Sequence, residues 1–525
     1  MLKHSIVMRR IELIRRPRLR RGPKFAHLRG VSKLKRSKHS LSHYRLLTCD
    51  MGELIPVACM EVLPGDSLQQ STSLLLRCSP LLAPVMHPVS VRVHHWYVPY
   101  RLLWDDWEDF ITGGDGQSGY SGTYPTITSP GGGWAVGSLP DYFGLPTGVA
   151  NLEVCAFPFR AYSKIWNEFY RDEDLQAEIA EDQTDITPIS WEKDYFSSAR
   201  PWPQKGGDVT LPLGTSAPVK GIGAINNVYS AGPLGVYETG ETAPTVFGDH
   251  KIINPAGANT QVAIERAGSS NFPNIYADLS AATSVDVNTV RLAFALQRYQ
   301  EARARWGSRY TEYLRYLGVR SSDARLQRPE YLGGGKQTIT FSEVLQSSTG
   351  ADADNVVGTM RGHGISAMRS RRYRRFFEEH GVVLSLLSIR PKVMYANGVH
   401  RQWSRRTKED YWQKELEHIG NQEVYNREIY AQGNGDDDDV FGYQDRYAEY
   451  RHIPSGVSGL FRSTLNYWHL ARILAAKPSL NSSFIQCVPS KRINAEQTKD
   501  ALWIMAMNSV QARRMVSKSA SSYIF

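Results

Sequence analysis

The sequence lacks long apolar runs. No stretch reaches 18 consecutive apolar residues, the length that a membrane-spanning helix requires. The first residues also lack the uninterrupted apolar region of a secretory signal peptide. We therefore expect a protein with no membrane span.

Cysteine is scarce, and the spacing of the cysteines matches no paired motif. The five cysteines are an odd number and form no C-x-x-C pair; they are Cys49, Cys59, Cys78, Cys155 and Cys487. Neither a disulfide framework nor a zinc finger fits that count and spacing. They are expected to be free thiols in a reducing cytosol.

Acidic residues are almost missing from the first 45 positions. This stretch holds 15 Lys and Arg against one acid, Glu12, a net charge of +14, whereas the remaining residues hold 47 basic and 51 acidic side chains. The net charge of +10 therefore belongs to an N-terminal arm, and the body is slightly acidic. An arm of this kind favours a polyanionic partner.

The arm is predicted to neutralise nucleic-acid phosphates without reading the bases. Its aromatic and histidine side chains, such as Phe25 and Tyr44, are expected to stack on unpaired bases. A solvated charge run and a mitochondrial transit peptide are the alternatives. The candidate DNA-binding residues are Arg9, Arg10, Arg15, Arg16, Arg18, Arg20, Arg21, Lys24, Arg29, Lys33, Lys35, Arg36 and Lys38.

Recognisable catalytic and metal-binding motifs are missing too. The chain has no G-x-S-x-G, no H-E-x-x-H and no Walker loop, because Gln337 follows the Gly-Gly-Gly-Lys run at 333–336. His94 and His95 would point to opposite faces of a strand and cannot share an ion there. The four acids at 436–439 are interpreted as a solvated loop, with a divalent-ion site as the alternative. We expect no enzyme activity, no cofactor and no metal.

Residues 157–207 carry the strongest local pattern. The spacing of Tyr162, Ile165, Trp166 and Phe169 predicts an amphipathic helix with an aromatic face. The prolines around Trp202 exclude a helix there.

Other patterns predict strands, helices and loops. Period-two alternation at 89–94 and a nearly continuous apolar run at 380–395 predict strands, the second buried on both faces. Apolar spacing from Leu292 to Leu317 predicts one long helix, and a capping box predicts another from 407 to 420. Residues 112–150 are expected to form a surface loop, and 492–507 a final strand or helix.

Several strings share an order with a known family. The strings are PFRAY-KIWNE-FRD within 158–172, DYF-SA-PWPQKG within 194–206, EVLPGD at 61–66, SLPDYFGLPTG at 138–148 and SSDARLQRPEYLGGG at 321–335. In these strings the chain resembles the major capsid proteins of the small single-stranded DNA phages, the microviruses, in their gokushovirus-like branch. The likeness covers most of residues 48–484.

The resemblance implies a mainly β protein, an eight-stranded antiparallel jelly roll with long inserted loops and several helices. The implied parts are an interior DNA-facing arm (1–47), a first part of the jelly roll (48–207), a surface insertion forming a protrusion (208–284) and the remainder (285–525). The low charge and length of residues 208–284 also suit a functional loop.

The implied function is a major capsid protein that self-assembles into a T=1 icosahedral shell around circular single-stranded DNA. Its implied partners are sixty copies of itself, the viral DNA, minor proteins (a pilot protein and a small DNA-binding protein) and a host receptor. Assembly is expected in the host bacterial cytoplasm, and residence in the virion. A jelly-roll lectin or glycosidase and a basic-armed RNA-binding protein are the alternatives.

Overall fold

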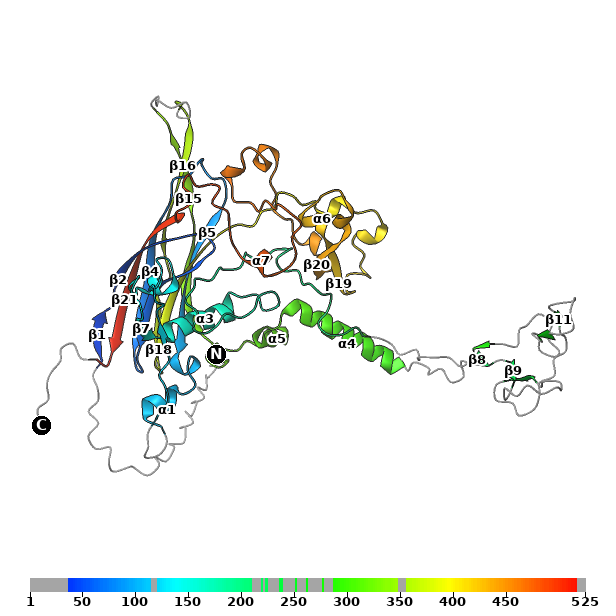
Figure 1. Ribbon diagram of the computed structural model, residues 1–525, viewed down its shortest axis with the longest axis horizontal. Coiled ribbons are helices and arrows are strands. Elements are labelled where there is room, and N and C mark those ends of the chain that lie inside the picture. Colours follow the sequence, from blue (N-terminus) through cyan, green and yellow to red (C-terminus); the bar gives the residue numbers. More distant parts are fainter. Residues whose placement is uncertain are drawn as a thin grey trace, which may run out of the picture.

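The computed structural model describes residues 36–114, 120–209, 287–347 and 356–516, with six short strands between 219 and 277. The protein is mainly β and is built around two large antiparallel sheets (Figure 1). Most of the arm, from 1 to 35, lies outside the described residues. Among the residues that the structure describes, no helix combines the length and the apolar character needed to cross a bilayer.

The first sheet has seven strands. Its order is β2–β21–β4–β16–β15, with β1 pairing the far end of β21 and β17 the far end of β4. The strands are β1 (Ser37–Ser40), β2 (His43–Cys49), β4 (Ser67–Cys78), β15 (Thr340–Leu345), β16 (Met360–Arg369), β17 (Tyr373–Phe376) and β21 (Leu502–Arg514). The region at 492–507, for which strand and helix were both open, contains the start of β21.

The second sheet has four strands in the order β14–β5–β18–β3. The strands are β3 (Leu54–Val62), β5 (Val89–Pro99), β14 (Glu330–Thr338) and β18 (Gly381–Pro391). The first half of β5 alternates between buried and half-buried side chains, and almost every residue of β18 is buried. Both predictions for these strands are confirmed.

The inner faces of the two sheets meet in an apolar core. Leu76 of β4, Val91 of β5, Leu387 of β18 and Ile504 of β21 are buried in it. Side chains from two stacked sheets interdigitate in this way in β-sandwiches, and the apolar area that they remove from water stabilises the pair.

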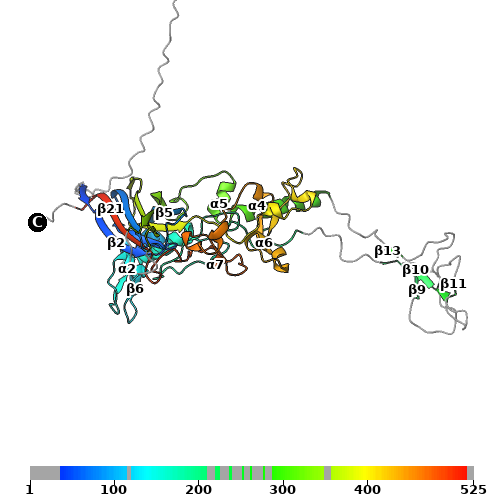
Figure 2. The ribbon, with the colours of Figure 1, turned by 90° about the horizontal axis from the view of Figure 1, so that it is seen from above.

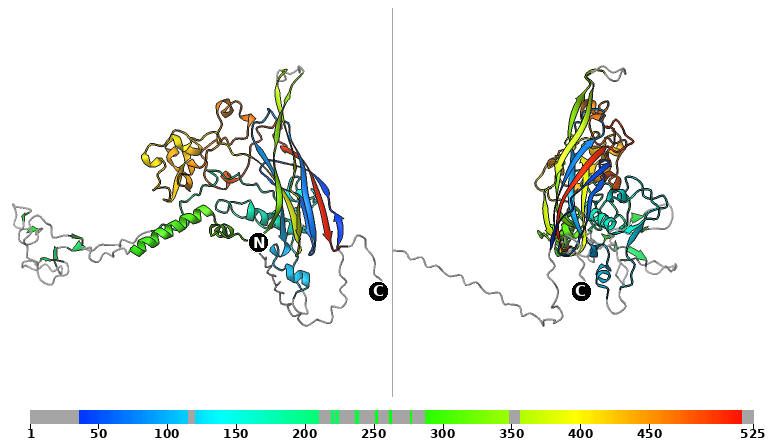
Figure 3. Two further views of the ribbon diagram at one scale, coloured as in Figure 1. Left: turned by 180° about the vertical axis from the view of Figure 1, so that it is seen from behind. Right: turned by 90° about the vertical axis from the view of Figure 1, so that its left-hand side faces the viewer.

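The outer face of the second sheet is covered. Helix α3 (Phe157–Phe169) packs its aromatic side chains on it, as the helical spacing predicted. The Tyr162 hydroxyl donates to the carbonyl of Leu54 at the start of β3 (2.9 Å) and accepts the amide of Thr187 (3.1 Å). Helices and loops gather on this flank, whereas the outer face of the first sheet is open (Figures 1 and 3).

The predicted long helix is two helices. Helix α4 (Val287–Trp306) ends at Gly307, whose φ of +98° is left-handed, and α5 (Tyr310–Tyr316) starts a new direction. The apolar spacing continues across the break, so periodicity alone did not reveal it. Glycine takes this backbone conformation without a Cβ clash.

The predicted helix at 407–420 is wrong. The capping box of Thr407 and Asp410 forms, but only a 3₁₀ turn (Lys408–Asp410) follows. The tyrosine hydroxyls of Tyr450 and Tyr447 accept the backbone amides of Trp412 and Gln413 (3.1 and 3.2 Å). Tertiary hydrogen bonds thus replace those of a helix.

The predicted surface loop at 112–150 is partly a packed element. Leu139 and Trp134 are buried, and α2 (Leu139–Phe143) lies against β3. The smaller elements of the body are α1 (Trp107–Thr112), β6 (Thr126–Thr128), β7 (Glu153–Cys155), β19 (Asn421–Tyr425), α6 (Asn426–Ile429), β20 (Val440–Asp445) and α7 (Ser482–Ile485).

The six short strands belong to the predicted insertion at 208–284. In the view from above they lie beyond α4, at the far end of the molecule from the two sheets (Figure 2). They pair as three antiparallel ladders and are β8 (Val219–Lys220), β9 (Ile222–Ala224), β10 (Val236–Glu238), β11 (Lys251–Ile252), β12 (Gln261–Val262) and β13 (Tyr276–Ala277).

Candidate nucleic-acid interface and assembly surfaces

Two of the thirteen candidate DNA-binding residues, Arg36 and Lys38, have described positions. The other eleven lie outside the described residues: Arg9, Arg10, Arg15, Arg16, Arg18, Arg20, Arg21, Lys24, Arg29, Lys33 and Lys35. The sheet starts at Ser37, so residues 37–47, which the sequence assigned to the arm, form β1 and most of β2. This placement limits the proposed arm to the residues before Ser37.

Arg36 and Lys38 lie at an edge of the first sheet. The Arg36 guanidinium carbon lies 4.9 Å from the ring centre of Phe376, and Nη1 lies 3.4 Å from the Ser67 hydroxyl oxygen. Lys38 is the cross-strand partner of Arg513. The first described residues of the chain therefore place positive charge beside the last strand.

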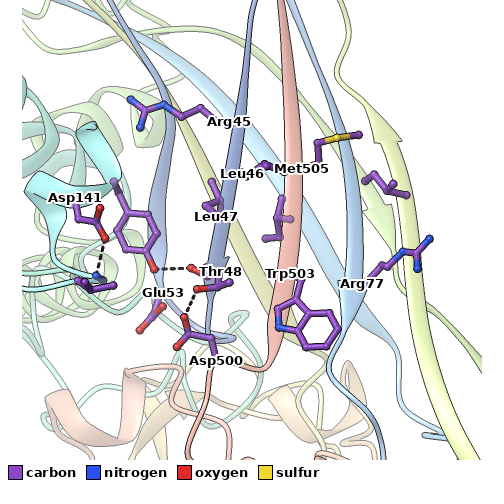
Figure 4. A pocket seen from close by; sticks show the side chains of 15 residues that line it. Arg45, Leu46, Leu47, Thr48, Glu53, Arg77, Asp141, Asp500, Trp503 and Met505 are labelled. Carbon is purple, nitrogen blue, oxygen red and sulfur yellow. Dashed lines mark hydrogen bonds between the residues drawn. The ribbon is translucent and has the colours of Figure 1, made fainter. Parts of the chain in front are cut away.

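An open groove lies where β2, β21 and the segment around α2 meet (Figure 4). Its volume is about 850 Å³. Leu46 (80% exposed) and Trp503 (48% exposed) project beside it. The Tyr142 hydroxyl donates to the Thr48 carbonyl at 2.6 Å, and the Thr48 hydroxyl donates to Asp500. An exposed apolar patch with a polar rim is typical of a contact surface.

None of these side chains was predicted from the sequence to form a contact surface. Trp503, Met505 and Met507 are exposed on β21, and the residues between them are buried. Exposure alternates with period two here, but residues 502–507 are apolar at every position, so the sequence shows no alternation of polar and apolar residues. For this reason the sequence of 492–507 fits both a strand and a helix.

A buried ionic network joins the two halves of the 157–207 stretch. Asp172, whose side chain is 2% exposed, pairs with Lys193 and with Arg200 Nη1 (3.3 Å). Burial alone would raise the pKa of Asp172, but the positive charges of Lys193 and Arg200 outweigh it and hold that pKa below its usual value. Asp174 continues the network to Lys205 Nζ at 2.9 Å. The network fixes the loop after α3 to the proline-rich segment.

The two histidines considered as metal ligands, His94 and His95, and the nearby His87 have separate partners. His94 Nδ1 contacts the Tyr170 hydroxyl (2.7 Å), whereas His95 lies between the hydroxyls of Ser385 and Ser370 on the opposite face of β5. His87 Nε2 lies 2.7 Å from a backbone carbonyl. Burial lowers the pKa of each to about 4, so all three are neutral at neutral pH.

The acidic loop at 436–439 is paired with protein groups. Lys477 Nζ lies 2.9 Å from Asp439, and the Asp437 carboxylate accepts the backbone amides of Gln432 and Gly433 at 2.8 Å each. In the described ranges, no three His, Cys, Asp or Glu side chains are grouped to hold a metal ion.

All five cysteines are free thiols. Burial raises the pKa of Cys59, Cys78 and Cys487 to about 12. These thiols therefore stay protonated and poorly reactive at neutral pH.

Two stacked antiparallel sheets with long insertions define the β-sandwich class, which serves in lectins, cell-surface domains and viral shells. Within that class, the model of the family described as capsid protein (F protein) matches residues 27–522. The chain belongs to this family of phage capsid proteins. It is a structural protein of the virion rather than an enzyme.

Three similar proteins share the name capsid protein VP1. The chain is 38% identical to that of Bdellovibrio phage phiMH2K (86% of this chain, 88% of the relative). It is 36% identical to that of Chlamydia phage 1 (86% and 89%) and 33% identical to that of Spiroplasma virus 4 (86% and 87%). The resemblance to microvirus capsid proteins is confirmed.

Proposed function

We propose that sixty copies of this protein form a T=1 icosahedral shell around a circular single-stranded DNA genome, which the basic arm neutralises. Membership of the capsid family supports the shell, and the net charge of +12 in the residues before Ser37 carries the DNA role. The lectin, glycosidase and RNA-binding alternatives have no support in the family. Sizing and electron microscopy of the expressed protein test the shell: subunits that stay monomeric at every concentration and salt would contradict it.

We also propose that the two principal sheets form a jelly roll. Eight strands taken in chain order are β2, β3, β4, β5, β14, β16, β18 and β21. Their order is first–eighth–third–sixth in one sheet and second–seventh–fourth–fifth in the other. This alternation between sheets is what two interlocked Greek keys produce. Strands β1, β15 and β17 then extend the first sheet.

The arm acts by counterion release. If about ten phosphates are contacted, single-strand affinity falls with salt at a log–log slope of about −7. Replacing Arg15, Arg16, Arg18, Arg20 and Arg21 with Gln keeps chain length and polarity but removes five charges. The variant should yield particles with less DNA, measured as the absorbance ratio at 260 and 280 nm.

An arm that only ties neighbouring subunits together is the rival role. It predicts that the five-Gln variant packages a full genome, and that deleting the arm disrupts the shell instead. A full complement of DNA in the five-Gln particles would therefore overturn the neutralising role.

The insertion at 208–284 is proposed as a surface protrusion that meets a host receptor. Its short strands lie beyond α4, away from the sheets, which supports this assignment (Figure 2). Deleting it should leave assembly intact and lower infection. Loss of folding on deletion would place the segment in the body.

A pilot protein and a small DNA-binding protein remain proposed partners, and assembly is proposed to occur in the host bacterial cytoplasm.

A further inference from the structure

The seven-stranded sheet has an open side, here called the outward face, made of the side chains that point away from the second sheet. On β21 it comprises Trp503, Met505, Met507, Gln511 and Arg513, which are exposed, with buried residues between them. Cross-strand partners share a side, so the register assigns the residues of the neighbouring strands. Helices and loops of the described chain gather on the other flank (Figure 3).

The outward face carries only positive formal charge. Its basic residues, all exposed, are Arg36, Lys38, Arg77, Arg361, Arg369, Arg374 and Arg513. The seven strands contain a single acid, Glu343, whose partner is Gly362, so it points to the other side from Arg361. Asp141 and Asp500 border the face at its groove end.

The outward cations differ from the inward ones in their partners. On the inward side, Arg375 pairs with Glu330 at 2.6 Å and Arg514 with Asp66 at 2.7 Å. None of the seven outward cations has an acidic partner within ion-pair distance among the described residues. A face of one sign raises the local concentration of anions and is suited to a polyanion.

Aromatic side chains lie among these cations. Trp503 is the cross-strand partner of Arg77, and its indole is half exposed beside the groove (Figure 4). Tyr44 of β2 is 65% exposed and is paired with Met507 of β21. The same row of cross-strand partners continues through Ser73 of β4 to Arg369 of β16, three strands from Tyr44. Exposed aromatic rings on a sheet between basic residues are what sheet-based single-strand binders use to stack bases.

We propose that the outward face is a second binding surface for unpaired nucleic acid, on which the seven cations hold phosphates and Trp503 and Tyr44 stack bases. The identity of the ligand as the packaged single strand rests on the proposed function. Arg36, the residue before the first strand, lies over Phe376 at the edge of this face. The basic arm is therefore joined in sequence to the sheet at the basic face. Binding does not depend on base sequence, because every base has a stacking surface.

The test uses the full-length protein with Arg77, Arg369, Arg374 and Arg513 replaced by Gln, leaving the arm unchanged. A matched control replaces four exposed basic residues elsewhere, Arg320, Arg325, Lys414 and Lys499. Binding of a short mixed-sequence DNA single strand by dissociated subunits is measured against salt. The face variant should lower the magnitude of the log–log slope by about 3, since each lost phosphate contact removes about 0.7. The control should leave the slope unchanged.

Stacking is tested separately with Trp503→Ala. The affinity for single-stranded DNA should fall about tenfold, within the range for one lost base stack, and the affinity for a duplex should not change. An equal loss on both nucleic acids would overturn the stacking role. Trp503→Tyr should restore most of the affinity.

The arm variant separates this inference from the proposed function. If face variants bind and package DNA normally while the arm variant does not, the face is not a DNA surface and the proposed function stands. If both bind and package normally, the DNA role itself fails. If face variants bind DNA normally but no longer assemble, the occupant of the face is a second copy of this chain, and the proposal is overturned.

Discussion

The two principal sheets differ in what lies on their outer faces. The second sheet is buried on both sides, between the inner core and α3 with its neighbouring loops. The first sheet has the same inner core but leaves its outer side open, with apolar side chains such as Leu46 in solvent. A strand covered on both faces is buried along its whole length, whereas a strand covered on one face alternates between buried and exposed residues. The burial of β18 and of β21 shows these two patterns.

The covered face therefore contributes mainly to the stability of the subunit, and the open face is available for binding partners. On the covered side, polar groups are hydrogen-bonded within the subunit, as the hydroxyl of Tyr162 on α3 shows. Outward residues of the first sheet contribute little to the subunit and are free for partners. Substitutions on the two outer faces should therefore have unequal effects on folding.

The largest expected effect is on the covered face. Leu386→Ala removes a fully buried side chain from the cluster that includes α3 and should lower the free energy of unfolding by about 3 kcal/mol. Met505→Ala on the open face should change it by less than about 0.5 kcal/mol. Urea unfolding of dissociated subunits measures both. Equal losses would show that the open face is also structural.

The second largest effect is expected in the ionic network around Asp172, which holds the loop after α3 against the proline-rich segment. Asp172→Asn leaves Lys193 and Arg200 without one carboxylate and should lower the free energy of unfolding by about 2 kcal/mol. This is less than the roughly 3–5 kcal/mol for breaking a fully buried pair, because Lys193 is half exposed. The exposed pair of Asp182 and Arg160 supplies the control: Asp182→Asn should cost less than about 1 kcal/mol.

The pH dependence of the Asp172 variant sharpens that result. The pKa of Asp172 is lowered in the folded protein, so its contribution is present above the ordinary carboxyl pKa and is lost as pH falls through the folded value. Asp172→Asn should therefore flatten the acid limb of the stability curve. An unchanged acid limb would mean that the network does not stabilise the fold.

The smallest effect concerns the corner between α4 and α5. Burial and the nearby charge of Glu173 raise the pKa of Glu312 to about 7. A raised carboxyl pKa stabilises the folded state below the unfolded value, and this contribution is lost as pH rises through about 7. The protection of the amides of residues 306–316, that is, their exchange corrected for its intrinsic pH dependence, should fall between about pH 4.5 and pH 7, and Glu312→Gln should remove that fall. A protection that still falls across this range in Glu312→Gln would contradict the role of Glu312.

Much of the covered sheet could be predicted because its signals are local. The apolar run of β18 and the helical spacing of α3 each fit within one element. The buried pairing of Asp172 with Arg200, in contrast, joins positions 28 residues apart and has no sequence signature.

The predictions that failed or were not made depend on tertiary contacts. The capping box at Thr407 formed, yet the hydroxyls of Tyr447 and Tyr450 bound the amides that a helix would have used. The outward face was not predicted because its cations come from five strands and the residue before the first of them, and only strand register brings Arg77, Arg369 and Arg374 together. The distribution of charge along the sequence indicated a nucleic-acid-binding role only for the arm.

The pairing of β1 with β21 places Ser37 opposite Arg514. A peptide attached before Ser37 and one attached after Arg514 would leave the subunit from the same edge of the same sheet. Cargo enzymes or fluorescent tags fused at either position should therefore emerge on one side of the shell. A short linker joining these two residues would also make the chain suitable for circular permutation, with new ends opened in a loop on the opposite flank.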